Sequence, residues 1–335
     1  MLPANKKNRL VYLASLSLLL SSIEYLIPKP VPFLKLGLAN LPLIISLPFL
    51  SGPEYFFLAF SKAIMQGIVG GTIISPFFAI SLSGTLATAL VMFISFRLLK
   101  HTTFVGISVL GALASNGAQL LMAALLIYGK SILVALPYIL ALGIITSAIL
   151  GYISNIFYKK SSFIRQCESN TLLPVGTVIE LNNKKVNKKV NKTLNIIFLV
   201  LAFCFIILSV VLTQLKLLII VLVLSYIIQI ASKRKLKISY PLILLISMVL
   251  LSLLEPNGKV VFKYFTDVSL TMAFTKAIRI LILIASSQIL VGSTTINIGF
   301  VKDVFTMSSI ILDKFGKVKG SVMERIDEAL IGDSK

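Results

Sequence analysis

The chain has 335 residues, of which 57% are hydrophobic and only 13% are charged, and its mean hydropathy is +0.98. A soluble globule of this size needs more polar surface, so the composition excludes one and predicts an all-α, polytopic membrane protein. The formal charge of +20 does not indicate nucleic-acid binding, because the basic residues form short clusters between apolar runs and no motif of such binders accompanies them.

Six apolar runs in the first half approach the length that crosses a bilayer, about 20 residues. They predict helices at about 10–27, 37–51, 55–71, 76–98, 103–128 and 132–158. The basic N-terminus resembles the start of a signal peptide, but the first apolar run lacks a small-residue cleavage site. We therefore expect a first spanning helix that starts inside.

Between the first two runs lies a proline-rich, polar, glycine-containing stretch, residues 28–40. Backbone without hydrogen-bond partners is not tolerated in lipid unless protein or a water-filled cavity covers it. A broken segment at membrane depth therefore points to a ligand site.

A basic segment follows the sixth run and reads as a cytoplasmic linker over residues 159–193, with at most a small hairpin at 174–179. Further apolar runs near 194–213, 216–231, 239–254 and 268–292 predict about four more transmembrane helices. From about residue 303 the tail is amphipathic, and we expect it to lie on the membrane surface. The predicted domains are thus 1–158, the linker 159–193 and a second membrane domain, 194–335.

The distribution of basic clusters predicts orientation. With the N-terminus inside, the 97–101 loop, the 159–193 linker and the 232–237 cluster all fall inside, while the proline-rich loop falls outside. The sequence therefore predicts a multi-pass protein of the cell membrane with a cytoplasmic N-terminus.

Residues that would carry out catalysis are not recognisable. No paired aspartates suit magnesium on a diphosphate, no Walker loop is present, and His101 has no Ser or Cys constellation around it. Cys167 and Cys204 have neither metal-ligand spacing nor a disulfide pattern. We expect no catalysis, no cofactor and no metal site.

Intramembrane polar residues are more informative. Lys62 lies in the middle of the third predicted helix, where a charge costs about 2.5–3.5 kcal/mol on insertion scales, and Gln66 shares its helical face. Either Lys62 pairs with Glu24 or it faces an anionic substrate. On the fifth helix Asn116 and Gln119 share a face, and either they bond neighbouring helices or they bind a ligand.

Small residues accompany these polar positions. Gly111, Ala112, Ala114 and Gly117 on the fifth predicted helix permit a neighbouring helix to approach closely. The Ser-Leu-Ser-Gly sequence at 81–84 is predicted to be a packing motif of the fourth helix.

Three sequence patterns resemble one family. They are the prolines followed by Lys-Leu-Gly-Leu-Ala-Asn at 35–40, the Lys62 to Gly67 stretch, and the Gly111 to Leu120 stretch. Over about residues 9–158 the chain is similar to the Gx transporter family, also labelled heptaprenyl diphosphate synthase component I. The resemblance implies a six-helix domain similar to the substrate-binding S components of energy-coupling factor transporters, in which residues 28–40 would cap an outward-facing cavity.

The second half weakly resembles a shortened T component of the same transporters, through the Ala-Ile-Arg-Ile-Leu sequence at 277–281 and the serines that follow. Under that resemblance Arg279 would pack against the first half, and the linker would tether a binding subunit to a scaffold subunit.

These observations predict a protein that binds a small solute for uptake, together with energising subunits or ATPases. The candidate substrate-binding residues are Lys35, Asn40, Lys62, Gln66, Asn116 and Gln119, with Glu24 as a possible ion-pair partner. One alternative is a non-catalytic membrane accessory of a prenyl diphosphate synthase, and another is a structural membrane scaffold.

Overall fold

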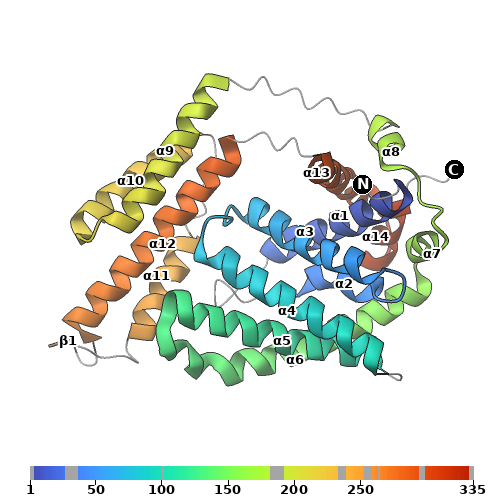
Figure 1. Ribbon diagram of the computed structural model, residues 1–335, viewed down its shortest axis with the longest axis horizontal. Coiled ribbons are helices and arrows are strands. Elements are labelled where there is room, and N and C mark those ends of the chain that lie inside the picture. Colours follow the sequence, from blue (N-terminus) through green and yellow to red (C-terminus); the bar gives the residue numbers. More distant parts are fainter. Residues whose placement is uncertain are drawn as a thin grey trace.

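The computed structural model describes residues 4–26, 37–99, 102–181, 192–232, 239–252, 259–262, 265–293 and 299–331. These residues form an almost entirely helical molecule, drawn in Figure 1. The exception is one short antiparallel hairpin, which pairs β1 (Val260–Phe262) with β2 (Phe265–Thr266). The fold is that of an all-α polytopic membrane protein.

The first region contains five longer helices and a short interrupted segment. They are α1 (Ala4–Leu26), the 3-10 turn η1 (Leu38–Asn40), α2 (Leu41–Ser46), α3 (Gly52–Gly70), α4 (Pro76–Leu98), α5 (Phe104–Ala123) and α6 (Leu136–Lys160). A π turn, η2 (Ala124–Tyr128), and a 3-10 segment, η3 (Gly129–Ala135), join α5 to α6. Local sequence explains the starts: prolines occupy the first turns of α3, α4 and α6, and Thr103 accepts a hydrogen bond from the Gly106 amide at the start of α5.

The prediction of a spanning helix over 37–51 is wrong. The segment forms η1 and the six-residue α2, which is about 9 Å long at 1.5 Å per residue and cannot cross a bilayer. Pro48 contributes to the end of α2, because it lacks the N–H that would continue the hydrogen bonds of the helix. All residues of α2 are buried, so protein covers this irregular backbone.

Residues 162–181 form two short helices, α7 (Ser162–Ser169) and α8 (Val175–Leu181), so residues 174–179 do not form the small hairpin that the sequence allowed at most. Helical spacing brings apolar side chains to one face: Val175 and Val178 are buried in the same core as α1. The Tyr12 hydroxyl also donates to the Leu173 carbonyl at 3.3 Å.

The second region contains α9 (Lys192–Val211), α10 (Leu215–Ala231), α11 (Ser239–Ser252) and α12 (Asp267–Ser293), close to the predicted runs. Helix α12 contacts the other three, and it also packs on the first region through Ala277 and Leu281, which meet Phe77, Ile80 and Tyr128. In Figure 1 this group lies at the left of the first region.

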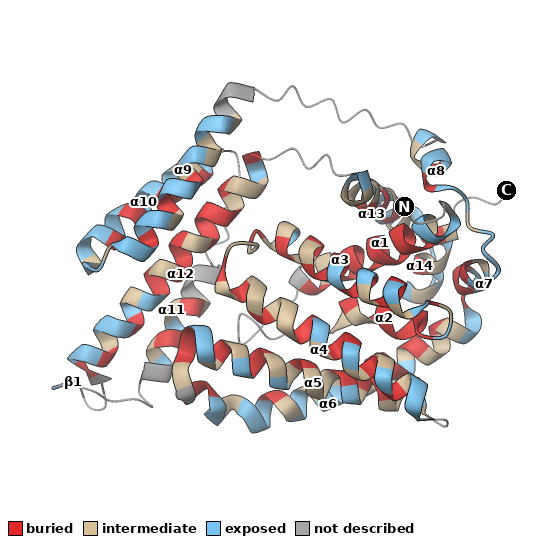
Figure 2. Cartoon of the chain, in the orientation of Figure 1, coloured by how far each residue is buried: buried red, intermediate tan, exposed pale blue. Residues whose placement is uncertain are grey.

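The amphipathic tail forms α13 (Gly299–Lys317) and α14 (Val322–Ile331). It does not lie apart on a surface: α13 packs along α1, and Val304, Met307 and Ile311 are buried in the core that α1 organises. Residues 10–20 of α1 are consequently buried on every side, as the nearly continuous red of α1 in Figure 2 shows.

Four helices in the described ranges are long and apolar enough to cross a membrane: Pro76–Leu98, Phe104–Tyr128, Ser131–Lys160 and Asp267–Ser293. Asn195–Val211 and Leu215–Ala231 are shorter apolar helices. Leucine and isoleucine side chains on these helices, such as Leu90, Leu125 and Ile220, are exposed, as a lipid-facing surface requires.

Candidate functional site

A polar cavity lies inside the first region, between α1, η1, α3, α4, α5 and α6. Its volume is about 40 Å³, which is room for about three water molecules. Polar side chains dominate the wall, together with small residues and the apolar Met92 and Leu150. The lining residues are Glu24, Gly37, Ala39, Asn40, Lys62, Gln66, Thr85, Met92, Ser108, Ala112, Ser115, Asn116, Gln119, Gly143, Thr146, Ser147 and Leu150.

Two buried ionisable groups line this cavity. Lys62 on α3 is 4% exposed and Glu24 on α1 is 3% exposed. The Lys62 ammonium donates a hydrogen bond to the Asn40 side-chain oxygen, and the Glu24 carboxylate accepts one from the Gly37 amide at 3.2 Å. Gly37 has a φ of +88°, which L side chains rarely adopt, so glycine is required where the chain turns into η1. The two charged groups thus hold the two ends of η1.

Three amide side chains complete the polar wall. Gln66 donates to the Ser21 hydroxyl, Asn116 to the Ile139 carbonyl at 3.3 Å, and Gln119 to the Ser115 hydroxyl at 2.8 Å. Each of these bonds fixes an amide on the cavity wall, and two of them join different helices. The amides are therefore held in defined orientations on the cavity wall.

Glycines make room for these amides. A Cβ at Gly84 would lie 2.5 Å from the Gln119 side chain, and one at Gly143 would lie 2.0 Å from Asn116 Nδ2. Gly111 likewise accommodates Met92, whereas Gly117 meets nothing within 4 Å and so plays no part in close packing. Gly84 of the 81–84 motif thus leaves the space that the Gln119 side chain occupies.

The structure brings Glu24, Asn40, Lys62, Gln66, Asn116 and Gln119 to this one cavity. Lys35 lies outside the described residues, as do residues 27–36 as a whole. Whether any of these residues binds a solute is a matter for the proposal below.

Sequence reasoning missed the contribution of α6 and the serines of α5. Ser108, Ala112, Ser115 and Gln119 recur at helical spacing, and so do Gly143, Thr146, Ser147 and Leu150, so a search for small and polar stripes would have found both faces. Ser108 stands out because its hydroxyl oxygen is buried without a hydrogen-bond partner among the described residues.

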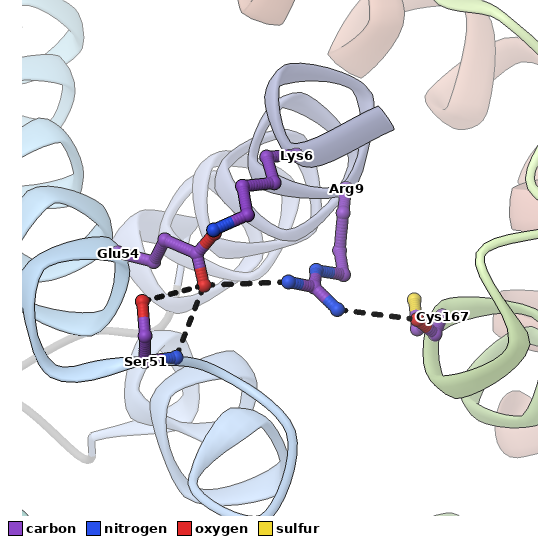
Figure 3. A network of polar contacts seen from close by, with 5 residues as sticks. All are labelled: Lys6, Arg9, Ser51, Glu54 and Cys167. Carbon is purple, nitrogen blue, oxygen red and sulfur yellow. Dashed lines mark hydrogen bonds and ion pairs between the residues drawn. The ribbon is translucent and has the colours of Figure 1, made fainter. Parts of the chain in front are cut away.

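A second polar network lies at the other end of α1, shown in Figure 3. Arg9 and Lys6 pair with Glu54 at 3.3 and 3.2 Å, and Glu54 also accepts from the Ser51 amide and hydroxyl. Burial alone would raise the pKa of the Glu54 carboxyl, but the Ser51 hydrogen bonds and the two cations hold that pKa below its ordinary value. Arg9 also reaches the Cys167 carbonyl at 3.5 Å, so this network ties α1 to α3 and α7.

The second region meets the first at the turn between α3 and α4. The Ile74 amide donates to the Ser287 hydroxyl at 3.4 Å, and a Cβ at Gly71 would collide with Gln288. Arg279, expected to pack against the first half, instead donates to the Leu212 carbonyl at the end of α9, at 2.9 Å. This hydrogen bond of Arg279 thus lies within the second region, at a carbonyl that follows the last turn of α9.

Within the described ranges no three His, Cys, Asp or Glu side chains group closely enough to hold a metal ion. The part of the wall that the structure describes offers hydrogen-bonding groups, the Lys62 ammonium and the Glu24 carboxylate, and such groups are suited to binding a polar molecule.

The fold and the cavity thus define a helical membrane protein with a polar cavity among its helices. Residues 13–157 match the family described as heptaprenyl diphosphate synthase component I. This is the family that the sequence patterns at 35–40, 62–67 and 111–120 resemble. Every lining residue of the cavity falls within the matched segment. Comparison with the curated proteins and with the solved structures finds no match.

Proposed function

We propose that the first region binds a small polar solute in the cavity and that the protein serves its uptake across the cell membrane. The observation that carries this proposal is the convergence of Lys62, Glu24 and three hydrogen-bonded amides on one cavity. Burying two charges and their partners away from lipid is costly, and such residues in membrane proteins generally mark substrate or ion pathways.

The proposed transport needs energy from elsewhere, since the chain is proposed to be non-catalytic. Similarity to S components would supply energising subunits or ATPases as partners. The packing of α13 on α1 supports a fused arrangement, because the end of the second half lies directly against the proposed binding region. A cytoplasmic N-terminus follows from the basic clusters, and topology reporters fused at each end of the chain would test it.

The second candidate function is a non-catalytic accessory of a prenyl diphosphate synthase, which the description of the matched family favours. It predicts that a soluble prenyltransferase subunit co-purifies with this chain and needs it for activity. A structural scaffold would instead bind no solute and recruit partners through the second region.

Binding to the purified full-length protein tests the transport proposal. A panel of vitamins, cofactor precursors, other small polar metabolites and prenyl phosphates is titrated against the wild type, Lys62→Ala and Asn40→Ala. We expect a ligand whose affinity falls about tenfold or more in both variants, as the loss of charged hydrogen bonds predicts. Gly117→Ala is the matched control on α5, since a Cβ there meets nothing within 4 Å. Unchanged affinity in both cavity variants would place the site elsewhere.

A further inference from the structure

Two buried hydroxyl groups at the cavity lack a strong hydrogen-bond acceptor among the described residues. Ser108 of α5 is 1% exposed and lines the cavity, and its hydroxyl oxygen has no partner in the described part of the chain. Tyr55 of α3 is fully buried, and its hydroxyl donates to the Met92 sulfur at 3.9 Å. A thioether sulfur is a weak acceptor. Since buried polar groups are nearly always hydrogen-bonded, the two hydroxyls indicate a place for a further acceptor beside them.

Other hydroxyls on the same wall use their protons within their own helices. Thr85 donates to the Ser81 carbonyl at 2.8 Å, and Ser147 donates to the Ile144 carbonyl at 3.0 Å. A helical serine commonly bonds a backbone carbonyl of the preceding turn in this way. Ser108 makes no such bond among the described residues, so its proton is available to a molecule in the cavity.

The Met92 side chain of α4 lies between the Tyr55 hydroxyl and the cavity. Met92 lines the cavity, whereas Tyr55 reaches it only through its contact with the Met92 sulfur. Gly111 leaves the space for this side chain, because a Cβ there would lie 2.3 Å from Met92 Cε. Ser108 is three residues before Gly111 and shares its face of α5. Methionine is flexible and repacks readily, so a turn of Met92 would open the Tyr55 hydroxyl to the part of the cavity that Ser108 lines.

We propose that the Ser108 and Tyr55 hydroxyls form a subsite that binds an acceptor oxygen of the solute, with the Met92 side chain as its movable wall. This inference rests on the proposed function and names a chemical feature of its substrate. Carbonyl, carboxylate and phosphate oxygens all accept hydrogen bonds from hydroxyls, whereas an ammonium group only donates and leaves both hydroxyl protons without a partner. The solute therefore carries at least one such oxygen at the Ser108 side of the cavity.

Equilibrium binding to the purified full-length protein tests the subsite. The probes are acetamide, acetate and inorganic phosphate, which present the three kinds of acceptor oxygen, methylammonium, which only donates, and the tightest-binding member of the solute panel. Each probe is titrated against the wild type, Ser108→Ala and Tyr55→Phe. We expect the panel member and at least one acceptor probe to bind about tenfold more weakly to both variants, as the loss of a hydrogen bond predicts. The acceptor probe that is affected identifies the kind of oxygen.

The stability of the ligand-free protein supplies an independent measurement. Ser154 of α6 is a matched control, because it is fully buried, lies outside the cavity lining and donates to the Leu150 carbonyl at 2.8 Å. Ser108→Ala and Ser154→Ala both gain the helix propensity of alanine, but only Ser154→Ala loses a hydrogen bond. We therefore expect a higher midpoint of thermal unfolding in Ser108→Ala than in Ser154→Ala, and unchanged binding of every probe in Ser154→Ala.

Several results would overturn the inference, and they separate it from the proposed function. If Lys62→Ala and Asn40→Ala weaken the panel member but Ser108→Ala or Tyr55→Phe does not, the subsite is wrong and the solute site stands. The subsite is also wrong if methylammonium is weakened as much as the acceptor probes, or if Ser108→Ala unfolds at or below the midpoint of Ser154→Ala. If no probe and no panel member binds to the wild type, both the subsite and the proposed function fail.

Discussion

The first region and helices α9–α12 both expose apolar side chains, yet they bury polar side chains in different ways. In the first region Lys62, Glu24 and Gln119 surround an open cavity. In the second region several buried polar side chains bond within the region: Ser225 and Ser286 donate to their own helices, and Gln229 donates to Gln288. Among the described residues only single atoms there, Gln229 Oε1 and Arg279 Nε, are buried without a partner, and they line no cavity with the residues of the first region. Polar side chains that line a cavity suit the solute proposed above, whereas hydrogen bonds between helices hold the helices together.

Close backbone packing is the feature of the first region most sensitive to mutation. A Cβ at Gly151 of α6 would lie 2.5 Å from the Val105 Cα and 2.8 Å from the Phe104 carbonyl oxygen of α5, and backbone cannot move aside as a side chain can. Gly151→Ala should cost about 3 kcal/mol, the upper end for overpacking. The midpoint of thermal unfolding in detergent measures this loss. Gly117→Ala, the control, should be neutral or stabilising, and equal midpoints for the two variants would contradict the packing argument.

The tail is the next target, since it belongs to the second half in sequence but packs on the first region. Asp327 of α14 accepts hydrogen bonds from the Ser161 hydroxyl and from the amides of Ser162 and Phe163, at 2.9 and 3.1 Å for the amides, at the start of α7. Asp327→Ala should destabilise α7 by about 1–2 kcal/mol, the usual cost of a lost cap.

Faster hydrogen exchange of the α7 amides would report that loss. Asp313→Ala removes the exposed pair with Lys317 and serves as the control, with an expected effect of less than about 1 kcal/mol. Exchange in α7 that is identical in the two variants would mean that the tail does not stabilise this helix.

Removing the hydrogen bond between Gln229 and Gln288 in the second region should have a smaller effect on stability. Gln229 is 2% exposed, and its amide nitrogen lies 2.5 Å from Gln288 Oε1. A double-mutant cycle with Gln229→Leu and Gln288→Leu should give a coupling of about 0.6 kcal/mol, the average for hydrogen bonds in membrane helices. Solute binding should not change in either variant. A tenfold loss of binding would show that the pair acts on the cavity, and the comparison of the two regions would then fail.

The smallest effect at neutral pH concerns Glu54. Its folded pKa lies below the ordinary value, since the Ser51 hydrogen bonds and the two cations outweigh burial. The ionised Glu54 carboxylate therefore makes its full contribution to the free energy of unfolding above the pKa of the unfolded chain, about 4.3. This contribution is lost as the pH falls through the lower pKa of the folded protein. Unfolding midpoints measured across this range should fall more steeply in the wild type than in Glu54→Gln. Parallel curves would be evidence that the network in Figure 3 contributes nothing through this carboxyl.

Much of the cavity could be anticipated because helical periodicity is a local property. Lys62 and Gln66 are four residues apart and Asn116 and Gln119 three, so each pair shares a face whatever surrounds the helix. The same rule applied to Ser108, Ser115 and Ser147 would have extended the site. That these faces meet depends on glycines such as Gly84 and Gly143, whose partners lie on other helices and leave no mark in the local pattern.

The amino-acid sequence alone determined the membrane class, most helix positions and the polar faces of α3 and α5, since hydropathy and periodicity depend on neighbours in the chain. Only the tertiary structure decided that 37–51 is a short interrupted segment, that α13 packs along α1, and that Glu24 and Lys62 line one cavity. These features depend on contacts between residues far apart in sequence, and such contacts are decided by how the helices pack as a whole.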